Sequence, residues 1–182
     1  MKNYKFSIIT PTHLYLPYLD ELWESIKGQT YKNWEWVLYL NGEMRESFLS
    51  KEIQYDKRVK IYKQEVKFSM LYTPRSNRNI GYLKKTAFLF GKGDILVEAD
   101  HDDILTSDCL EELNKAFQKN VGFVYSDCAA IGQKKPFSAE LGWKHSEYEY
   151  KGKKLISMSA FEPAADRVSS MWFSPHHVRA WR

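Results

Sequence analysis

Residues 94–103 read Asp-Ile-Leu-Val-Glu-Ala-Asp-His-Asp-Asp, and this stretch decides the fold that we expect for the chain. The apolar run at residues 95–97 follows a turn that contains Gly93, a pattern that predicts a buried strand. Four carboxylates come directly after the run, within residues 98–103. They stand where a strand would leave a sheet, which is where open α/β sheets bind their ligands.

Asp100 and Asp102 admit two interpretations. Neighbouring carboxylates repel one another unless a positive charge joins them, and a divalent cation with a phosphate-bearing ligand would supply that charge. Alternatively, acidic residues at such a place solvate a loop or cap the next helix, and Asp108, three residues before Glu111, is placed for capping. The side chain of His101 would point away from both aspartates in an extended stretch, so it is not favoured as a ligand.

Strand and helix patterns alternate outward from this stretch. Apolar runs predict strands at residues 6–10, 34–40, 58–62 and 121–125, and apolar residues at helical spacing predict helices at 16–26, 82–90 and about 110–117. This alternation predicts an α/β fold with a mostly parallel central sheet and helices on both faces. One edge of that sheet would then collect the following segments: Thr10-Pro11-Thr12, Asn41-Gly42 and Asp100-His101-Asp102.

The composition is that of one ordinary soluble domain, with 182 residues, 43% hydrophobic and 27% charged. The net charge of +4 comes from scattered basic residues that form no stripe, which argues against a nucleic-acid partner. No apolar stretch approaches ~20 residues, and the N-terminus has no signal-peptide pattern, so we expect a cytoplasmic protein without a transmembrane segment. Cys109 and Cys128 fit no zinc spacing and are expected to be free thiols.

Four segments also match one pattern in order and spacing. They are residues 6–12, the Ser25-Ile26-x-x-Gln29-Thr30-Tyr31 signature with Trp34-Glu35, the Asn79-Ile80-Gly81 segment, and the acidic strand at 93–103. In this order they resemble the family 2 glycosyltransferases, which have the GT-A nucleotide-diphospho-sugar transferase fold. The resemblance covers about residues 5–125, with a weaker echo at 170–182. It implies a Rossmann-like, mostly parallel central sheet with helices on both faces.

The resemblance implies transfer of a sugar, with inversion, from a nucleotide-diphosphate donor to the hydroxyl of a saccharide or other acceptor. It implies a donor-nucleotide site made of Thr10, Pro11, Thr12, Asn41, Arg78, Asn79, Gly81 and Asp100. Asp102, with Asp100, would ligate Mn²⁺ or Mg²⁺ against the diphosphate, and His177 is a further candidate ligand. Arg78, Lys84 or Lys85 would supplement that cation, unless the lysines are simply solvated.

The chain departs from the family pattern in two places. Asn41 stands where many members carry an acidic residue that contacts the base; its amide both donates and accepts, and Asn-Gly is also an ordinary turn, so the base stays open. An inverting transferase also needs a general base, which the family usually supplies beyond the segment that resembles residues 170–182. We therefore expect the base beyond Arg182, in a chain that is C-terminally truncated.

We accordingly expect a single GT-A-like domain over residues 1–182. Residues 1–125 would be the nucleotide-sugar-binding part, and residues 126–182, which show little periodicity until a helix start near 175–182, would begin an incomplete acceptor-side part. An alternative is a nucleotide- or glycan-binding fragment without turnover. A nucleotidylyltransferase would require a glycine- and arginine-rich loop after the first strand, which Thr10-Pro11-Thr12 is not.

Overall fold

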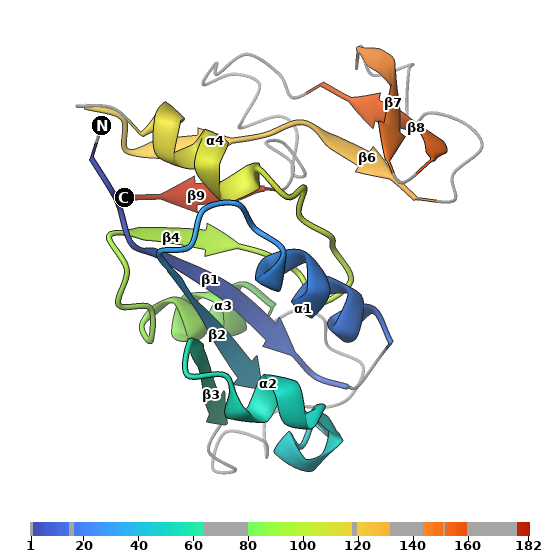
Figure 1. Cartoon of the computed structure of the whole chain (residues 1–182). Helices are drawn as coiled ribbons and strands as arrows, with labels where there is room; N and C mark the ends of the chain where they lie inside the picture. The colour runs from blue at the N-terminus through green and yellow to red at the C-terminus, as the bar shows by residue number, and fades with distance from the viewer. Residues whose placement is uncertain are drawn as a thin grey trace. The chain divides into compact units, whose positions relative to one another are not determined.

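The apolar runs of the sequence become parallel strands in the computed structural model, which describes residues 2–14, 17–63, 80–117, 120–131, 144–150, 152–159 and 178–182. The first strands are β1 (Phe6–Thr12), β2 (Trp34–Leu40), β3 (Val59–Lys63) and β4 (Ile95–Glu98). β1 pairs in parallel with both β2 and β4, and β2 pairs in parallel with β3 (Figure 1). Every residue of β1 and β2 is buried, as expected for a parallel sheet that is covered on both faces.

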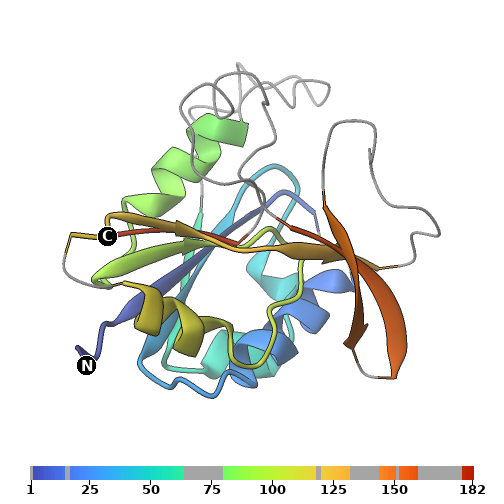
Figure 2. The same cartoon turned by 90° about the horizontal axis from the view of Figure 1, so that it is seen from above.

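The helices cover the two faces of this sheet. They are α1 (Tyr18–Lys27), the 3₁₀ helix η1 (Glu46–Phe48), α2 (Lys51–Tyr55), α3 (Ile80–Phe88) and α4 (Cys109–Ala116). α3 lies on one face, while α1 and α4 lie on the other (Figure 2). On the α1 face, Trp23 stacks on Trp36 of β2 with ring centroids 5.5 Å apart. On the α3 face, Leu83 packs with Ile9 and Val37 in one buried cluster.

The last strand, β9 (Arg179–Trp181), extends the sheet beyond β4, in the order β3-β2-β1-β4-β9. The expectation of a helix start at residues 175–182 is therefore wrong for these residues. Ala180 is fully buried, and the backbone N–H of Arg182 donates to the carbonyl oxygen of Gly122 at 3.0 Å. This segment is a strand because of contacts with residues far away in the sequence. The local spacing of apolar residues does not reveal such contacts, so it could not predict the strand.

The described residues divide into two units, residues 1–122 with 180–182 and residues 123–179. The second unit contains β5 (Phe123–Tyr125), β6 (Cys128–Ala130), β7 (His145–Tyr150) and β8 (Lys153–Met158). β6, β8 and β7 form an antiparallel sheet in that order. Most of β7 is exposed, so the sequence lacks the apolar alternation that would have predicted it.

Cys109 and Cys128 are both free thiols, as the sequence predicted. Within the part of the chain that the structure describes, no helix has the length and apolar character needed to cross a membrane.

Candidate functional site

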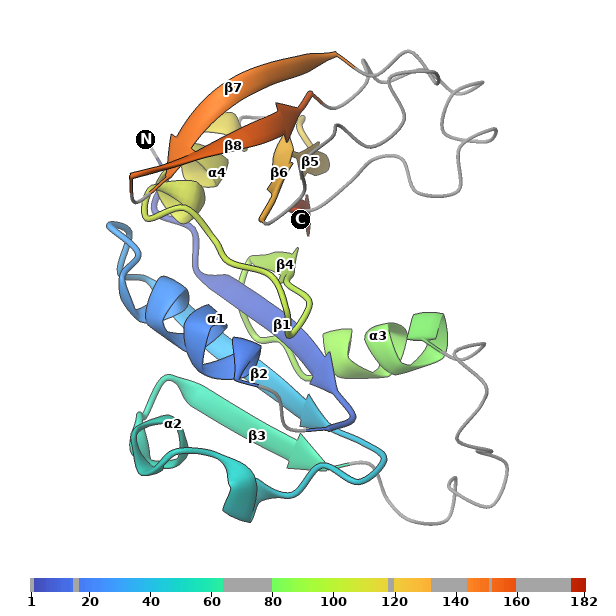
Figure 3. The ribbon, with the colours of Figure 1, turned by 90° about the vertical axis from the view of Figure 1, so that its right-hand side faces the viewer.

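The carboxyl ends of β1, β2 and β4 meet at one edge of the sheet (Figure 3). Thr12 is the register partner of Leu40, and the backbone N–H of Asn41 donates to the carbonyl oxygen of Thr12 at 2.9 Å. On the other side of β1, the N–H of Ala99 donates to the carbonyl oxygen of Ile9 at 3.2 Å. The structure thus brings together the three strand ends that the sequence predicted to share an edge.

Two histidine rings connect the loops that follow β1 and β4. The rings of His13 and His101 meet edge to face, with centroids 5.7 Å apart. The carbonyl oxygen of His13 also accepts a hydrogen bond from the N–H of Glu43 at 3.2 Å, in the turn that follows β2. Burial, together with the nearby His101, lowers the pKa of His13 and favours its neutral form. Sequence reasoning did not single out His13, although its place one residue past the strand was a usable signal.

The hydroxyl groups of the two β1 threonines make hydrogen bonds inside the unit. The indole Nε1 of Trp36 donates to Oγ1 of Thr10 at 3.0 Å, and Oγ1 of Thr12 donates to the carbonyl oxygen of Leu14 at 3.0 Å. Thr10 and Thr12 are both buried. These bonds hold the end of β1 in place, and a hydroxyl that accepts from Trp36 still has its own proton to donate.

Asn41 is buried, and its side-chain Nδ2 has no hydrogen-bond partner among the described residues. Its backbone carbonyl accepts from the N–H of Met44 at 3.2 Å, and Gly42 has a φ of +61°, so the segment also makes a tight turn. A buried donor without a partner costs about 1–3 kcal/mol. An acceptor atom of a bound ligand would remove that cost.

Lys84 of α3 forms ion pairs with two carboxylates at the end of β4. Its Nζ lies 2.5 Å from Oε1 of Glu98, 2.8 Å from Oδ1 of Asp100 and 3.1 Å from Oδ2 of the same residue. Burial by itself would lower the pKa of Lys84, but the charges and hydrogen bonds of Asp100 and Glu98 outweigh it and raise that pKa. Lys84 is therefore charged and half-buried, unlike its neighbour Lys85, which is exposed.

Asp102 is exposed, and its carboxylate makes no hydrogen bond or ion pair with any described residue. No cluster of three or more His, Cys, Asp or Glu side chains suited to a metal ion occurs within the described ranges. Mg²⁺ in nucleotide sites needs only one or two carboxylates besides the phosphate oxygens. The donor set at Asp100 and Asp102 therefore fits a cation that binds jointly with a diphosphate, and it does not fit a metal site built from protein ligands alone.

The capping interpretation of the acidic cluster receives no support from the structure. Asp108 occupies the N-cap position of α4, but its side chain makes no capping hydrogen bond.

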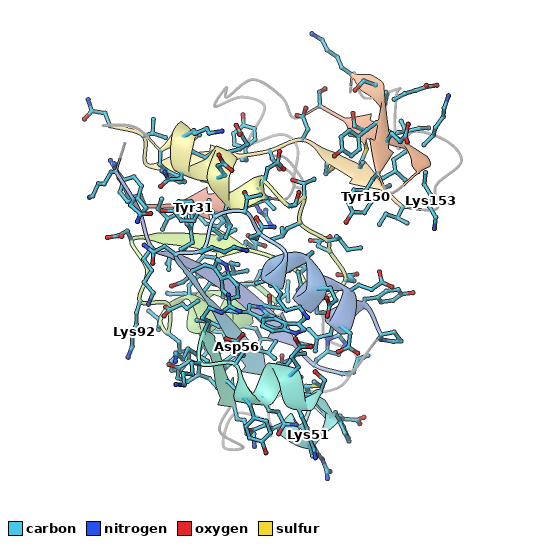
Figure 4. The ribbon with its side chains drawn as sticks, in the orientation of Figure 1. Tyr31, Lys51, Asp56, Lys92, Tyr150 and Lys153 are labelled. Carbon is cyan, nitrogen blue, oxygen red and sulfur yellow. The ribbon has the colours of Figure 1, made fainter. Side chains whose placement is uncertain are left out.

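The Gln29-Thr30-Tyr31 signature holds the unit together. Gln29 is fully buried; its Nε2 donates to the carbonyl oxygen of Thr106 at 2.7 Å, and its Oε1 accepts from the N–H of Leu110 at 3.0 Å. The hydroxyl of Tyr31 (labelled in Figure 4) donates to the carbonyl oxygen of Tyr4 at 2.6 Å. These contacts join the segment after α1 to the start of α4 and to the residues that precede β1.

Glu35 has a structural place as well, at the amino end of β2 and away from the candidate edge. Its Oε1 accepts from the hydroxyl of Ser7 and from the backbone N–H of Lys92, both at 2.7 Å, and its Oε2 pairs with Nζ of Lys5 at 2.5 Å.

Three of the predicted site residues lie outside the described residues, namely Arg78, Asn79 and His177. Gly81 lies in the first turn of α3, with no atom within 4 Å of where a Cβ would stand. Among the described residues, the predicted site therefore reduces to the ends of β1, β2 and β4, together with Lys84.

Comparisons with known proteins agree with this architecture. The model of the family described as "Glycosyl transferase family 2" matches residues 7–175. A comparison with curated proteins found no match.

Two solved structures share the fold. The mannosyltransferase PcManGT from Pyrobaculum calidifontis, in complex with GDP-Man and Mn²⁺, superposes with a TM-score of 0.55 at 20% identity, covering 69% of this chain and 36% of that one. Residues 1–349 of S. aureus TarS, in complex with UDP, superpose with a TM-score of 0.57 at 17% identity, covering 74% of this chain and 38% of that one. The chain thus spans a little over a third of each of these proteins and has their GT-A fold.

Proposed function

Because the chain belongs to glycosyl transferase family 2, we propose that it contributes the donor site for transfer of a sugar from a nucleoside-diphosphate sugar to an acceptor hydroxyl, with inversion and with a divalent cation. The two solved structures support a donor of this class, because PcManGT is in complex with GDP-Man and Mn²⁺ and TarS is in complex with UDP.

The observation that carries the proposal is the meeting of polar groups at the carboxyl edge of the sheet. Asn41 presents a buried amide without a partner, and Asp102 presents an exposed carboxylate without a partner among the described residues. The first suits a nucleobase edge, since an amide both donates and accepts hydrogen bonds. The second suits a cation that accompanies a diphosphate.

Each group has a distinct task in this proposal. Thr10, Pro11 and Thr12, at the end of β1, line the nucleotide site, and Asn41 contacts the base of the nucleotide. Arg78, Asn79 and Gly81 would complete the nucleotide site. Asp102, with Asp100 beside it, would hold Mn²⁺ or Mg²⁺, which when bound neutralises the charge that grows on the diphosphate leaving group.

Isothermal calorimetry tests the donor site directly. We expect UDP, GDP or dTDP to bind in the presence of Mn²⁺ and to bind at least roughly tenfold more weakly without it, since the Asp100 and Asp102 carboxylates would otherwise face the diphosphate unshielded. Asp102→Ala should abolish the metal-dependent part of the binding.

Asp108→Ala is the matched control, because it removes an exposed carboxylate nearby that makes no capping hydrogen bond. It should leave binding unchanged. Metal-dependent binding that survives in the Asp102→Ala variant would contradict the metal assignment, and failure of all three nucleotides to bind would contradict the proposed function itself.

A further inference from the structure

We propose that Lys84 is a positioning residue of this site, which holds Asp100 in an ion pair and leaves Asp102 as the carboxylate that meets the cation first. The inference rests on the proposed function, because it concerns how the same edge of the sheet takes up its metal. It predicts that the cation and the nucleotide bind together, and that the cation alone binds weakly.

The geometry places Lys84 firmly against Asp100. Its Nζ lies within 3.1 Å of both Asp100 carboxylate oxygens, so neither oxygen is left without a positively charged neighbour. Leu83 and Ala87, on the same helix, are buried in the core cluster and hold α3 against the sheet. Core packing therefore sets where the ammonium group lies.

Glu98 makes the position of Lys84 harder to change. It is the last residue of β4, its side chain is only 5% exposed, and its Oε1 lies 2.5 Å from the ammonium nitrogen. Removing the opposite charge from a buried carboxylate is costly, so the ion pair with Glu98 keeps the ammonium group of Lys84 in place. The ammonium group of Lys84 thus pairs with two carboxylates at once: the buried Glu98 and Asp100 of the candidate site.

The positive charge of Lys84 gives Asp100 and Asp102 different affinities for a cation. A divalent cation that ligated Asp100 would stand within a few ångströms of a fixed positive charge, and this repulsion opposes its binding. Asp102 carries no such neighbour among the described residues. A diphosphate would supply both the missing oxygen ligands and enough negative charge to offset Lys84.

Mn²⁺ binding to the nucleotide-free protein, followed by the electron paramagnetic resonance signal of free Mn²⁺, tests the inference. The informative variant is Lys84→Met combined with Glu98→Gln, because Lys84→Met alone would remove the ammonium group that faces the buried Glu98 carboxylate. Compared with Glu98→Gln alone, we expect the double variant to bind Mn²⁺ roughly tenfold more tightly, since a positive charge next to a ligand has been removed. A fold defect would weaken binding, so it cannot imitate this gain.

Two further variants complete the design. Adding Asp100→Asn to the double variant should cancel the gain, while Lys51→Met, which removes an exposed lysine of α2 (labelled in Figure 4), should change nothing. Mn²⁺ binding that is equal or undetectable in the double variant and in Glu98→Gln overturns the inference, as does a gain that survives Asp100→Asn. If nucleoside diphosphates fail to bind the unaltered protein with Mn²⁺, the proposed function is overturned instead. The Mn²⁺ titrations of the variants contain no nucleotide, so their result does not depend on that outcome.

Discussion

Single buried polar residues connect segments that lie far apart in this chain, and Glu35 makes several such contacts near the amino ends of the strands. Its carboxylate is buried and receives hydrogen bonds from Lys5, Ser7 and the backbone of Lys92. Burial raises the pKa of Glu35, but these bonds outweigh burial and bring it below its usual value of 4.5. The ionised form therefore stabilises the folded state.

The sign of this shift predicts a pH dependence. Since the folded-state pKa of Glu35 lies below the unfolded-state value, its contribution is complete above the unfolded-state pKa and disappears as the pH falls through the folded-state pKa. We expect Glu35→Gln to lower the free energy of unfolding by about 2 kcal/mol at pH 7. The difference from the unaltered protein should shrink in acid, once both side chains are neutral.

Urea unfolding at pH 7 and at a pH below the usual carboxyl pKa measures this difference. Glu43→Gln, which neutralises an exposed carboxylate in the turn after β2, is the control and should have little effect at either pH. A difference for Glu35→Gln that stays constant across this range would contradict the assignment.

At the scale of elements, Gly93 sets how closely the start of β4 approaches β1. A Cβ at this position would lie 2.6 Å from the carbonyl oxygen of Lys5 and 2.7 Å from the backbone nitrogen of Ser7. Both are backbone atoms at the start of β1, which pairs with β4, so neither can move aside cheaply. The N–H of Gly93 also donates to the Ser7 hydroxyl at 2.7 Å.

We therefore expect Gly93→Ala to lower the free energy of unfolding by more than about 2 kcal/mol, because overpacking against backbone cannot relax locally. Thermal or urea unfolding followed by circular dichroism measures the change. Gly122→Ala is the matched control, since nothing lies within 4 Å of its added Cβ. Equal effects of the two substitutions would show that the close approach at Gly93 has no energetic importance.

The elements differ in how far the sequence predicted them, and burial explains the difference. β1 and β2 are buried at every position, so their apolar runs were visible, and the helices between them were found from apolar spacing. β7 is largely exposed, and β9 has only three residues, whose burial depends on contacts outside the segment. Neither leaves a periodic signal in the sequence.

The candidate site was predicted to a similar extent. The sharing of one edge by Thr10, Asn41 and Asp100 followed from the parallel sheet alone. The ion pairs of Lys84 did not, because a lysine on a helix is usually solvated and its direction depends on how α3 packs. Gln29 matched a family signature, but only the structure reveals its hydrogen bonds to Thr106 and Leu110.

At the scale of the whole molecule, residues 180–182 belong to the unit that residues 1–122 build. Trp181 meets Phe88 edge to face at 5.3 Å, and the guanidinium of Arg182 donates to the hydroxyl of Tyr4 at 3.1 Å. These contacts join both ends of the chain to the same unit. The segment at 179–182 therefore contributes to the stability of elements that lie far from it in the sequence.

Deleting residues 179–182 should lower the free energy of unfolding by about 2–4 kcal/mol, because it exposes apolar surface of Phe88 and removes a strand whose Ala180 is fully buried. Far-UV circular dichroism in urea measures this without relying on the fluorescence of the deleted Trp181. Arg182→Ala, which keeps the strand, should cost less than about 1.5 kcal/mol. A deletion as mild as this single substitution would contradict the role given to β9.

β9 also bears on the order of events during synthesis. A ribosome releases residues 1–122 first, but the strand that extends their sheet beyond β4 emerges only after all of residues 123–179 have been made. At usual translation rates this delay lasts several seconds, during which the edge of β4 lacks its neighbour. An unpaired strand edge can pair with other chains and start aggregation. During this interval, the exposed edge of β4 is therefore a surface that a chaperone could cover.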